Sequence, residues 1–284
     1  MLYLLFVIIL FYSVCTAQVL PGSRQTAICN SDVALSDDVF AVFNNPAGLS
    51  QIPWTETGAY YSPSPFGLKE LANGFAAFNI PFSEGSLSAG VMTYGYNLYR
   101  ENKFLISYSR QVTKNLFAGA AINYHHVSIH NYGNDGSIYF NFGIKGFLTN
   151  DIHFGFDILN VNHATFGDEQ EQIPMVFNSG FSFNFSDIFL LHISVNKDII
   201  YDYSVSGGVE YFLLNILTIR SGVSTKPVKY SAGTGIHIKY FSFDYALSLH
   251  QDLGLTHQIS LIYSFNEYEN RQKEIKSYLG MNED

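Results

Sequence analysis

The chain has 284 residues, of which 47% are hydrophobic and 16% aromatic but only 14% are charged, and its formal net charge is −9. A soluble domain carries about 25% charged residues on average, so this composition argues against an ordinary soluble enzyme. The 25 Phe and 20 Tyr residues exclude a disordered chain, the acidic balance argues against a nucleic-acid partner, and a mean hydropathy of +0.08 excludes a bundle of membrane helices.

The first segment, residues 1–17, is predicted to be a secretory signal peptide. Residues 2–14 are almost entirely apolar, and Cys15-Thr16-Ala17 offers a small-x-small cleavage site after Ala17. A lipoprotein site at Cys15 and a permanent anchor are the alternatives, although a spanning helix needs about 20 apolar residues. Cys29 would then be the one remaining thiol, and we expect it to be a small buried residue.

Residues 18–53 are predicted to form a small hatch that contains a short helix. Ser36 or Asp37 can cap this helix, and the carboxylates of Asp37 and Asp38 would then lie near its positive end. Helix is unfavourable at Asn45 because Pro46 follows it. A helix stop followed by a turn would by itself explain the Asn, Pro and Gly residues here.

From residue 54 to residue 265 the hydrophobic pattern has a period of two, which is typical of β-strands. About 14 such segments occur, each roughly 8–13 residues long, and a tilted transmembrane strand needs about 9–11. Phe140 and Phe154 belong to the apolar side and are expected to face lipid. The predicted strands are 54–62, 73–82, 85–96, 102–112, 115–129, 136–148, 151–161, 173–185, 188–197, 203–213, 215–224, 229–239, 240–250 and 255–265.

Alternation alone fits both a soluble sandwich and a membrane barrel, because each buries one face of a sheet. Three features favour the barrel. The polar positions are mainly Ser, Gly, Asn and Thr with few charges, the apolar positions are rich in Phe, Tyr and Ile, and short connections alternate with longer ones. The sequence therefore predicts an all-β fold: a transmembrane antiparallel β-barrel of about 14 strands at 54–265, in a bacterial outer membrane, with an N-terminal hatch or plug.

Residues 266–284 are predicted to be a charged periplasmic tail. Such a chain end is usually frayed and solvated, and this is what we expect here. The alternative is a docking helix for a periplasmic partner, in which Tyr268, Ile275 and either Tyr278 or Leu279 share one helical stripe.

If the polar side of each strand faces inward, several ionisable side chains lie in the lumen. Glu210 and Arg220 would come within about one diagonal step of each other, and His237 would lie roughly opposite Asp244. We expect these groups to be paired charges that stabilise a plugged lumen, with a polar path as the alternative. No nucleophile–base or metal-ligand spacing accompanies them, so neither an enzyme nor a cofactor or metal is predicted. The lumen candidates are Lys145, Asp157, Glu210, Arg220, His237 and Asp244.

The stretch Ser36–Leu49, SDDVFAVFNNPAGL, resembles the N-terminal signature of FadL-like outer-membrane barrels, and most of all the branch of the PorV/PorQ proteins of type IX secretion. The resemblance implies a signal peptide, a small hatch and a 14-stranded barrel. The residues that would form the hatch motif are Asp37, Asp38, Asn45, Pro46, Ala47 and Gly48.

The resemblance also implies a function in contact with outer-membrane lipid. The expected function is that of a PorV/PorQ-type partner or shuttle in secretion or envelope assembly, with a translocon or secreted cargo proteins as partners. The alternative is a FadL-like transporter that carries a hydrophobic small molecule such as a long-chain fatty acid. In FadL the molecule leaves through a lateral opening at a kink in the third strand, for which Gly90 or Gly95 would be the candidates here.

Overall fold

The computed structural model describes residues 20–167, 171–186, 188–214 and 216–281. The predicted signal peptide and its cleavage site lie outside these residues, so this assignment stays a prediction. None of the helices among the described residues has the length and apolar composition of a membrane-crossing helix.

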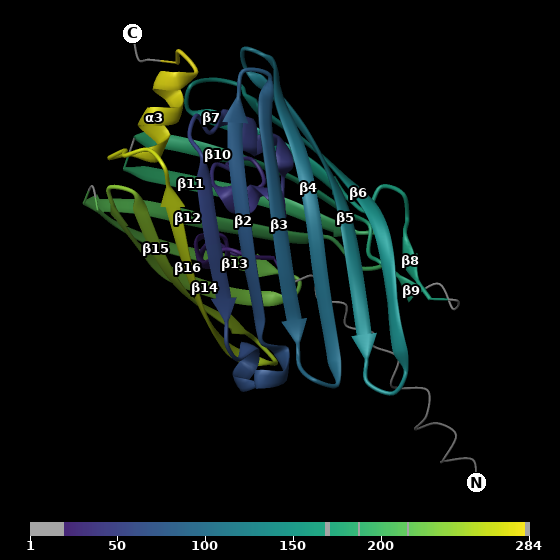
Figure 1. The fold of residues 1–284 in the computed structure, drawn as a ribbon. Helices are drawn as coiled ribbons and strands as arrows, with labels where there is room; N and C mark the ends of the chain where they lie inside the picture. The colour runs from purple at the N-terminus through teal and green to yellow at the C-terminus, as the bar shows by residue number, and fades with distance from the viewer. Residues whose placement is uncertain (1–19, 168–170, 187, 215, 282–284) are drawn as a thin grey trace.

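Fourteen antiparallel strands form a closed barrel, in which β1 pairs with both β2 and β16 (Figure 1). This confirms the predicted fold class. A separate two-stranded hairpin, β8 (Thr165–Phe166) and β9 (Glu171–Gln172), lies between β7 and β10 in the chain. The barrel strands are β1 (Glu56–Ser62), β2 (Asn73–Phe82), β3 (Gly85–Gly95), β4 (Tyr99–Thr113), β5 (Leu116–Ile129), β6 (Gly133–Phe147), β7 (Ile152–Leu159), β10 (Val176–Ser186), β11 (Phe189–Asp198), β12 (Ser204–Leu214), β13 (Leu217–Thr225), β14 (Val228–Ile238), β15 (Phe241–His250) and β16 (Gly254–Ser264).

The two faces of the wall follow the period-two pattern. In β6, Phe140 and Phe142 are 38% and 49% exposed on the outer surface, whereas Tyr139 and Asn141 are buried inside. Phe154 on β7 is also on the outward side, as expected. Because each barrel strand pairs with a strand on both sides, the paired part of this wall can lie in lipid.

The two ends of the barrel differ in their connections. Short turns join β2 to β3, β4 to β5 and the corresponding later pairs at one end, which we call the turn end. The other end, the loop end, carries longer connections, including residues 63–72 with the short helices η4 (Pro65–Gly67) and η5 (Lys69–Leu71). In outer-membrane barrels the short turns face the periplasm, which assigns the turn end to that side.

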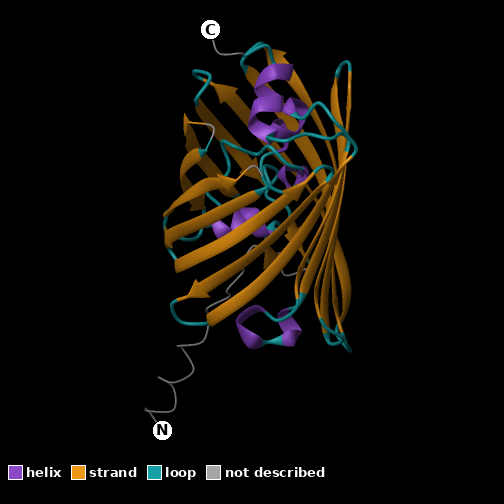
Figure 2. Cartoon of the chain, turned by 90° about the vertical axis from the view of Figure 1, so that its left-hand side faces the viewer, coloured by secondary structure: helices purple, strands orange, loops and turns teal. Residues whose placement is uncertain are grey.

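Residues 20–55 fold inside the barrel as a plug (Figure 2). The plug contains α2 (Ser23–Ala27) and the 3-10 helices η2 (Val39–Val42) and η3 (Pro46–Gln51). The predicted short helix is present as η2, but its predicted cap is wrong. Asp38 caps it by accepting a hydrogen bond from the backbone N–H of Phe40 at 2.9 Å, because Ser36 binds back to the carbonyl of Asp32 and the carboxylate of Asp37 is held by Arg24.

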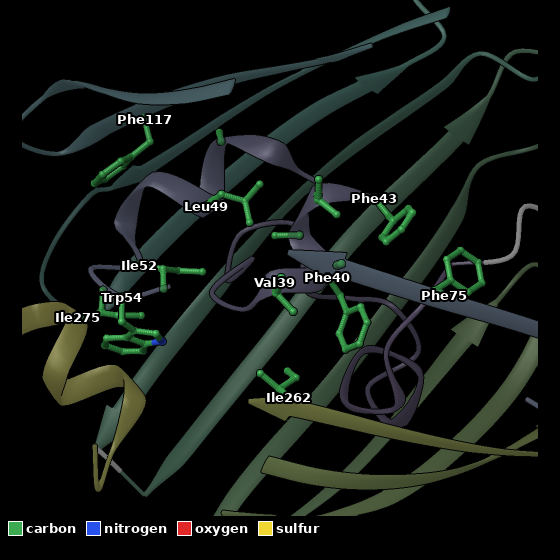
Figure 3. Close-up of a cluster of buried hydrophobic side chains, with 14 of the residues drawn as sticks. Val39, Phe40, Phe43, Leu49, Ile52, Trp54, Phe75, Phe117, Ile262 and Ile275 are labelled. Atoms are coloured by element: carbon green, nitrogen blue, oxygen red, sulfur yellow. The ribbon is translucent and has the colours of Figure 1, made fainter. Parts of the chain in front are cut away.

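The hydrophobic core of the molecule lies within the barrel (Figure 3). Plug side chains such as Phe40, Leu49 and Trp54 pack against inward-facing wall residues that include Phe117 and Ile262. The outer surface of the wall is left to lipid, so the apolar side chains of this protein form two separate sets.

The C-terminal tail is not frayed over its described residues, and this part of the prediction is wrong. It forms helix α3 (Arg271–Tyr278), capped by Asn270, whose side chain accepts a hydrogen bond from the Lys273 backbone N–H. Tyr268, Ile275 and Leu279 form its buried stripe, whereas Tyr278 is 59% exposed. The apolar stripe therefore packs on the protein's own plug.

Candidate functional site: the plugged lumen

The plug rests against the wall at glycine residues. A Cβ atom added to Gly143 would lie 2.1 Å from Asn45 Oδ1, and one added to Gly119 would lie 2.6 Å from the backbone N of Ala47. Nine strands each contain one glycine at which an added Cβ would lie within 2.7 Å of a plug atom, and we call these nine residues the glycine belt. Its members are Gly58, Gly90, Gly119, Gly143, Gly155, Gly180, Gly208, Gly222 and Gly233. Because no wall side chain fits at these positions, the plug can approach the wall closely.

The Asn-Pro-Ala-Gly part of the hatch motif forms a docking corner at β5 and β6. The amide of Asn45 donates to the carbonyls of Val33 and Ile144, at 2.9 and 3.1 Å, and its Oδ1 accepts from the Ala47 N–H. Pro46 occupies the first position of η3, where its missing N–H costs nothing. Gly48 has no room for a Cβ, which would lie 2.0 Å from the Ser36 carbonyl oxygen.

A buried ion network joins the other side of the plug to the wall. Arg24 of the plug pairs with Asp37 at 2.6 Å and with Glu210 of β12 at 2.8 Å. Arg220 of β13 pairs with the same Glu210 at 2.6 Å and with Asp244 of β15 at 2.5 Å. Removing one partner from such a network leaves a buried charge unpaired, which costs about 3–5 kcal/mol.

Glu210 and Arg220 are therefore neighbours, as predicted, although they lie directly opposite rather than diagonally. Arg24 was missed by the sequence analysis. It is the one basic residue between residues 18 and 53, in a segment that faces several predicted lumenal carboxylates. That charge complementarity was the available signal.

The remaining lumen candidates have separate partners. Lys145 is fully buried and donates to the backbone carbonyl of Leu35 in the plug, whereas Asp157 accepts a hydrogen bond from the Asn178 amide at 2.9 Å. Lys145 thus holds the plug, and Asp157 is bound to the neighbouring strand.

The predicted position of His237 opposite Asp244 is wrong. Because the turn between β14 and β15 contains only Lys239 and Tyr240, His237 pairs with Ser242, and Asp244 pairs with Gly235. The His237 ring contacts Ser242 Oγ at 2.9 Å and the Tyr268 carbonyl at 2.7 Å instead.

Asp38 is the plug carboxylate with the most altered ionisation. It is buried, it accepts a hydrogen bond from the Gln25 amide at 2.7 Å, and Arg24 Nη1 is 3.8 Å away. Burial raises the pKa of Asp38 to about 7, although the charge of Arg24 acts in the opposite direction. Its protonation therefore changes near neutral pH.

Two cavities lie on opposite sides of the plug. The loop-side cavity has a volume of about 20 Å³, enough for about one water molecule, and the turn-side cavity about 230 Å³. The turn-side cavity lies between the plug, β12–β16 and the C-terminal segment. The loop-side cavity is lined by Leu20, Phe43, Phe75, Lys103, Leu105, Asn123, Tyr139, Asn141 and Leu159.

The predicted kink in the third strand is wrong. From Ser86 to Tyr94, β3 pairs with both β2 and β4 without a shift in register. A Cβ at Gly90 would lie 2.6 Å from the Phe43 ring, so this glycine makes room for the plug. Gly95 only ends the strand, with φ = +96°.

The wall is paired over a shorter length between β6 and β7. Their last pair toward the loop end is Phe142 with Ile158, so Gly133–Asn141 extend beyond it. The residues after β7 bind this part of β6. The Val161 N–H donates to the Phe140 carbonyl at 2.9 Å, and the side chain of Asn162 accepts from the Phe140 N–H at 3.0 Å and donates to the Ile138 carbonyl at 3.1 Å.

Several solved outer-membrane proteins share this fold. The toluene transporter TbuX of Ralstonia pickettii superposes with a TM-score of 0.65 at 13% identity, over 87% of this chain and 98% of that chain. The CymD monoaromatic hydrocarbon channel gives 0.66 at 14% identity, over 88% and 100%. A Pseudomonas aeruginosa FadL homologue gives 0.62 at 13% identity, over 88% and 99%. Neither protein-family models nor curated proteins match the chain.

The protein therefore has the FadL-like, 14-stranded outer-membrane barrel fold with a plugged lumen. TbuX is named as a toluene transporter and CymD as a monoaromatic hydrocarbon channel. The comparisons do not show membership of the PorV/PorQ family.

Proposed function

We propose that the protein carries hydrophobic small molecules across the outer membrane. The observation that carries this proposal is the loop-side cavity, where Phe43 of the plug meets apolar wall residues such as Phe75, Leu105 and Leu159. Small-molecule sites are typically apolar with a few polar groups, and here Lys103 and Asn123 supply polar groups. The similar structures that are named as toluene and monoaromatic hydrocarbon channels support the same substrate class.

The loop-end part of β6, which β7 does not pair, supports a route for the substrate. Tyr139 and Asn141 of this edge, together with Leu159 of β7, also line the loop-side cavity. Among the described residues, Val161 and Asn162 rather than another barrel strand hold this part of β6, so a small opening there would connect the cavity with the lipid. The cavity holds about one water as it stands, so binding of a larger molecule requires such a movement.

An uptake assay tests the proposal. Radiolabelled toluene and a radiolabelled long-chain fatty acid are offered to a host without its own channel for these compounds. Leu105→Trp fills the cavity and should reduce uptake by roughly tenfold, whereas Ile106→Trp, on the lipid side of the same strand, should leave it unchanged. Heat-dependent electrophoretic mobility confirms that each barrel is folded. No uptake of either compound by the wild-type protein would contradict the proposal.

The second candidate is the partner or shuttle role in secretion or envelope assembly. It rests on the resemblance of Ser36–Leu49 to the PorV/PorQ signature. Purification from the native envelope in mild detergent tests it. A translocon or secreted protein bound in stoichiometric amount would favour this role, and a bound lipid or fatty acid without such a protein would favour transport.

A further inference from the structure

The C-terminal segment contacts the plug at the turn end of the lumen. Arg271 Nη1 donates to the backbone carbonyl of Asp37 at 2.8 Å, and the Gln272 amide donates to the Asp37 carboxylate. The Arg271 guanidinium also binds the carboxylate of Glu56 on β1. Asp37 is in turn the partner of Arg24, so the buried ion network continues from the wall through the plug to α3.

A stack of rings holds the residues that precede α3. Tyr268 lies between Trp54, at the end of the plug, and His237 of β14, with ring centroids 4.7 and 4.3 Å apart. The Arg271 guanidinium lies 5.5 Å from the Trp54 ring centroid and 5.0 Å from that of Tyr268. The C-terminal segment is thereby attached to the plug and to the wall at one point.

Helix α3 lies at the turn end of the barrel (Figures 1 and 2). Its buried Ile275 and Leu279 belong to the same core cluster as Ile52 of the plug. Lys276 pairs with Asp151, in the turn between β6 and β7, at 2.9 Å. The segment is thus attached at β1 and β14, at the plug, and at the β6–β7 turn.

We propose that α3 is a latch that holds the plug in the lumen, and that the plug is released toward the periplasm only when α3 detaches. This inference rests on the proposed transport function, because a molecule that continues from the loop-side cavity through the lumen to the turn end can pass only if the plug moves. The turn-side cavity of about 230 Å³ separates α3 from the β12–β16 wall. Detachment of α3 therefore breaks contacts on one face of the helix and leaves the barrel pairing intact.

The thiol of Cys29 reports directly on the plug. It is 8% exposed, lies two residues beyond α2, and contacts Ser231 Oγ at 3.3 Å. In a chain that carries Cys15→Ser, the rate of its reaction with a maleimide measures how often the plug loosens. Combined Arg271→Ala and Gln272→Ala substitutions remove the polar contacts of the latch with the plug and with Glu56, and they leave the Lys276–Asp151 pair in place. Glu274→Ala changes an exposed residue of the same helix and serves as the control.

We expect the double variant to react at least about tenfold faster than wild type, and the control to react at the wild-type rate. Equal rates in all three, with the barrels shown to be folded, would overturn the latch. If the double variant does not form a barrel, Arg271→Lys replaces it. Lysine keeps the charge but lacks the guanidinium that bonds Asp37 and Glu56 together, so the labelling rate should increase by a smaller factor. A wild-type rate for this variant would then overturn the proposal. Because labelling needs no substrate, its result is independent of whether the uptake assay supports transport.

Discussion

Adjacent residues of β12 allow a sharp test of the glycine belt. Gly208 faces the plug, and an added Cβ would lie 2.4 Å from Ile28 Cβ and 2.8 Å from the Ile28 carbonyl oxygen. Gly207 faces the opposite side, where the nearest atom to an added Cβ is the His192 carbonyl oxygen at 3.6 Å. Gly208→Ala therefore forces the plug or the strand to move, and Gly207→Ala does not.

The size of the effect follows from these distances. Ordinary contact begins at 3.4 Å, so the Ile28 side of the plug must shift by about 1 Å to accept a methyl group at Gly208. Overpacking of this kind costs about 1–3 kcal/mol, which corresponds to roughly a 5- to 150-fold change in the equilibrium between the seated and the loosened plug.

Maleimide labelling of Cys29, the residue next to Ile28, is the assay. Gly208→Ala should accelerate labelling by that factor, and Gly207→Ala should match the wild-type rate. Both variants must show the heat-dependent electrophoretic mobility of a folded barrel. If the two variants label equally fast, the glycines are not what seats the plug, and the packing argument is refuted.

Three further predictions concern the wall, the ion network and pH. Phe140→Arg combined with Phe154→Arg should prevent barrel assembly, because each Arg near the bilayer midplane costs about 2–4 kcal/mol; normal insertion would contradict the outward assignment. Arg220→Ala should lower the urea midpoint by an amount equivalent to about 3–5 kcal/mol, because it leaves Glu210 short of a partner, and Arg220→Lys should lose less. The pKa of Asp38 is about 7 in the folded protein and lower in the unfolded chain. Protonated Asp38 therefore stabilises the seated plug, and this contribution is complete below about pH 4. The contribution is lost as the pH rises through 7. The labelling rate of the plug thiol should thus rise more between pH 6 and 8 in wild type than in Asp38→Asn, and parallel profiles would exclude this group.

The strands were predictable because the membrane imposes one rule on every residue of the wall. Outward side chains must be apolar and inward ones small or polar, so the period of two is visible even in short segments such as Phe189–Asp198, predicted as 188–197. Register was less predictable. The position of His237 depended on a two-residue turn, and a small error in the turn moved it away from Asp244.

The plug contacts and the latch could not be read from the sequence, for physical reasons. Residues 20–55 have no continuous period. Charge complementarity indicated only that Arg24 could face lumenal carboxylates, and it could not specify Glu210, 186 residues further along the chain. Helix α3 has only eight residues and many charges, which resembles a solvated tail. Its Arg271 is instead satisfied by Glu56, a pairing that only the folded barrel brings together. Gly90 likewise suggested a bend, although its role is to make room for Phe43.

The arrangement of the plug also constrains how the protein is made. Helix η3 packs against β3–β6, which follow it closely in the chain, whereas α2 packs against β13–β16, which are synthesised last. The seam between β1 and β16 joins the first and last strands, and once it is formed the plug is enclosed. The contacts of α2 can therefore form only after the final strands are made. Folding of this protein thus depends on contacts of very high sequence separation and is expected to be slow.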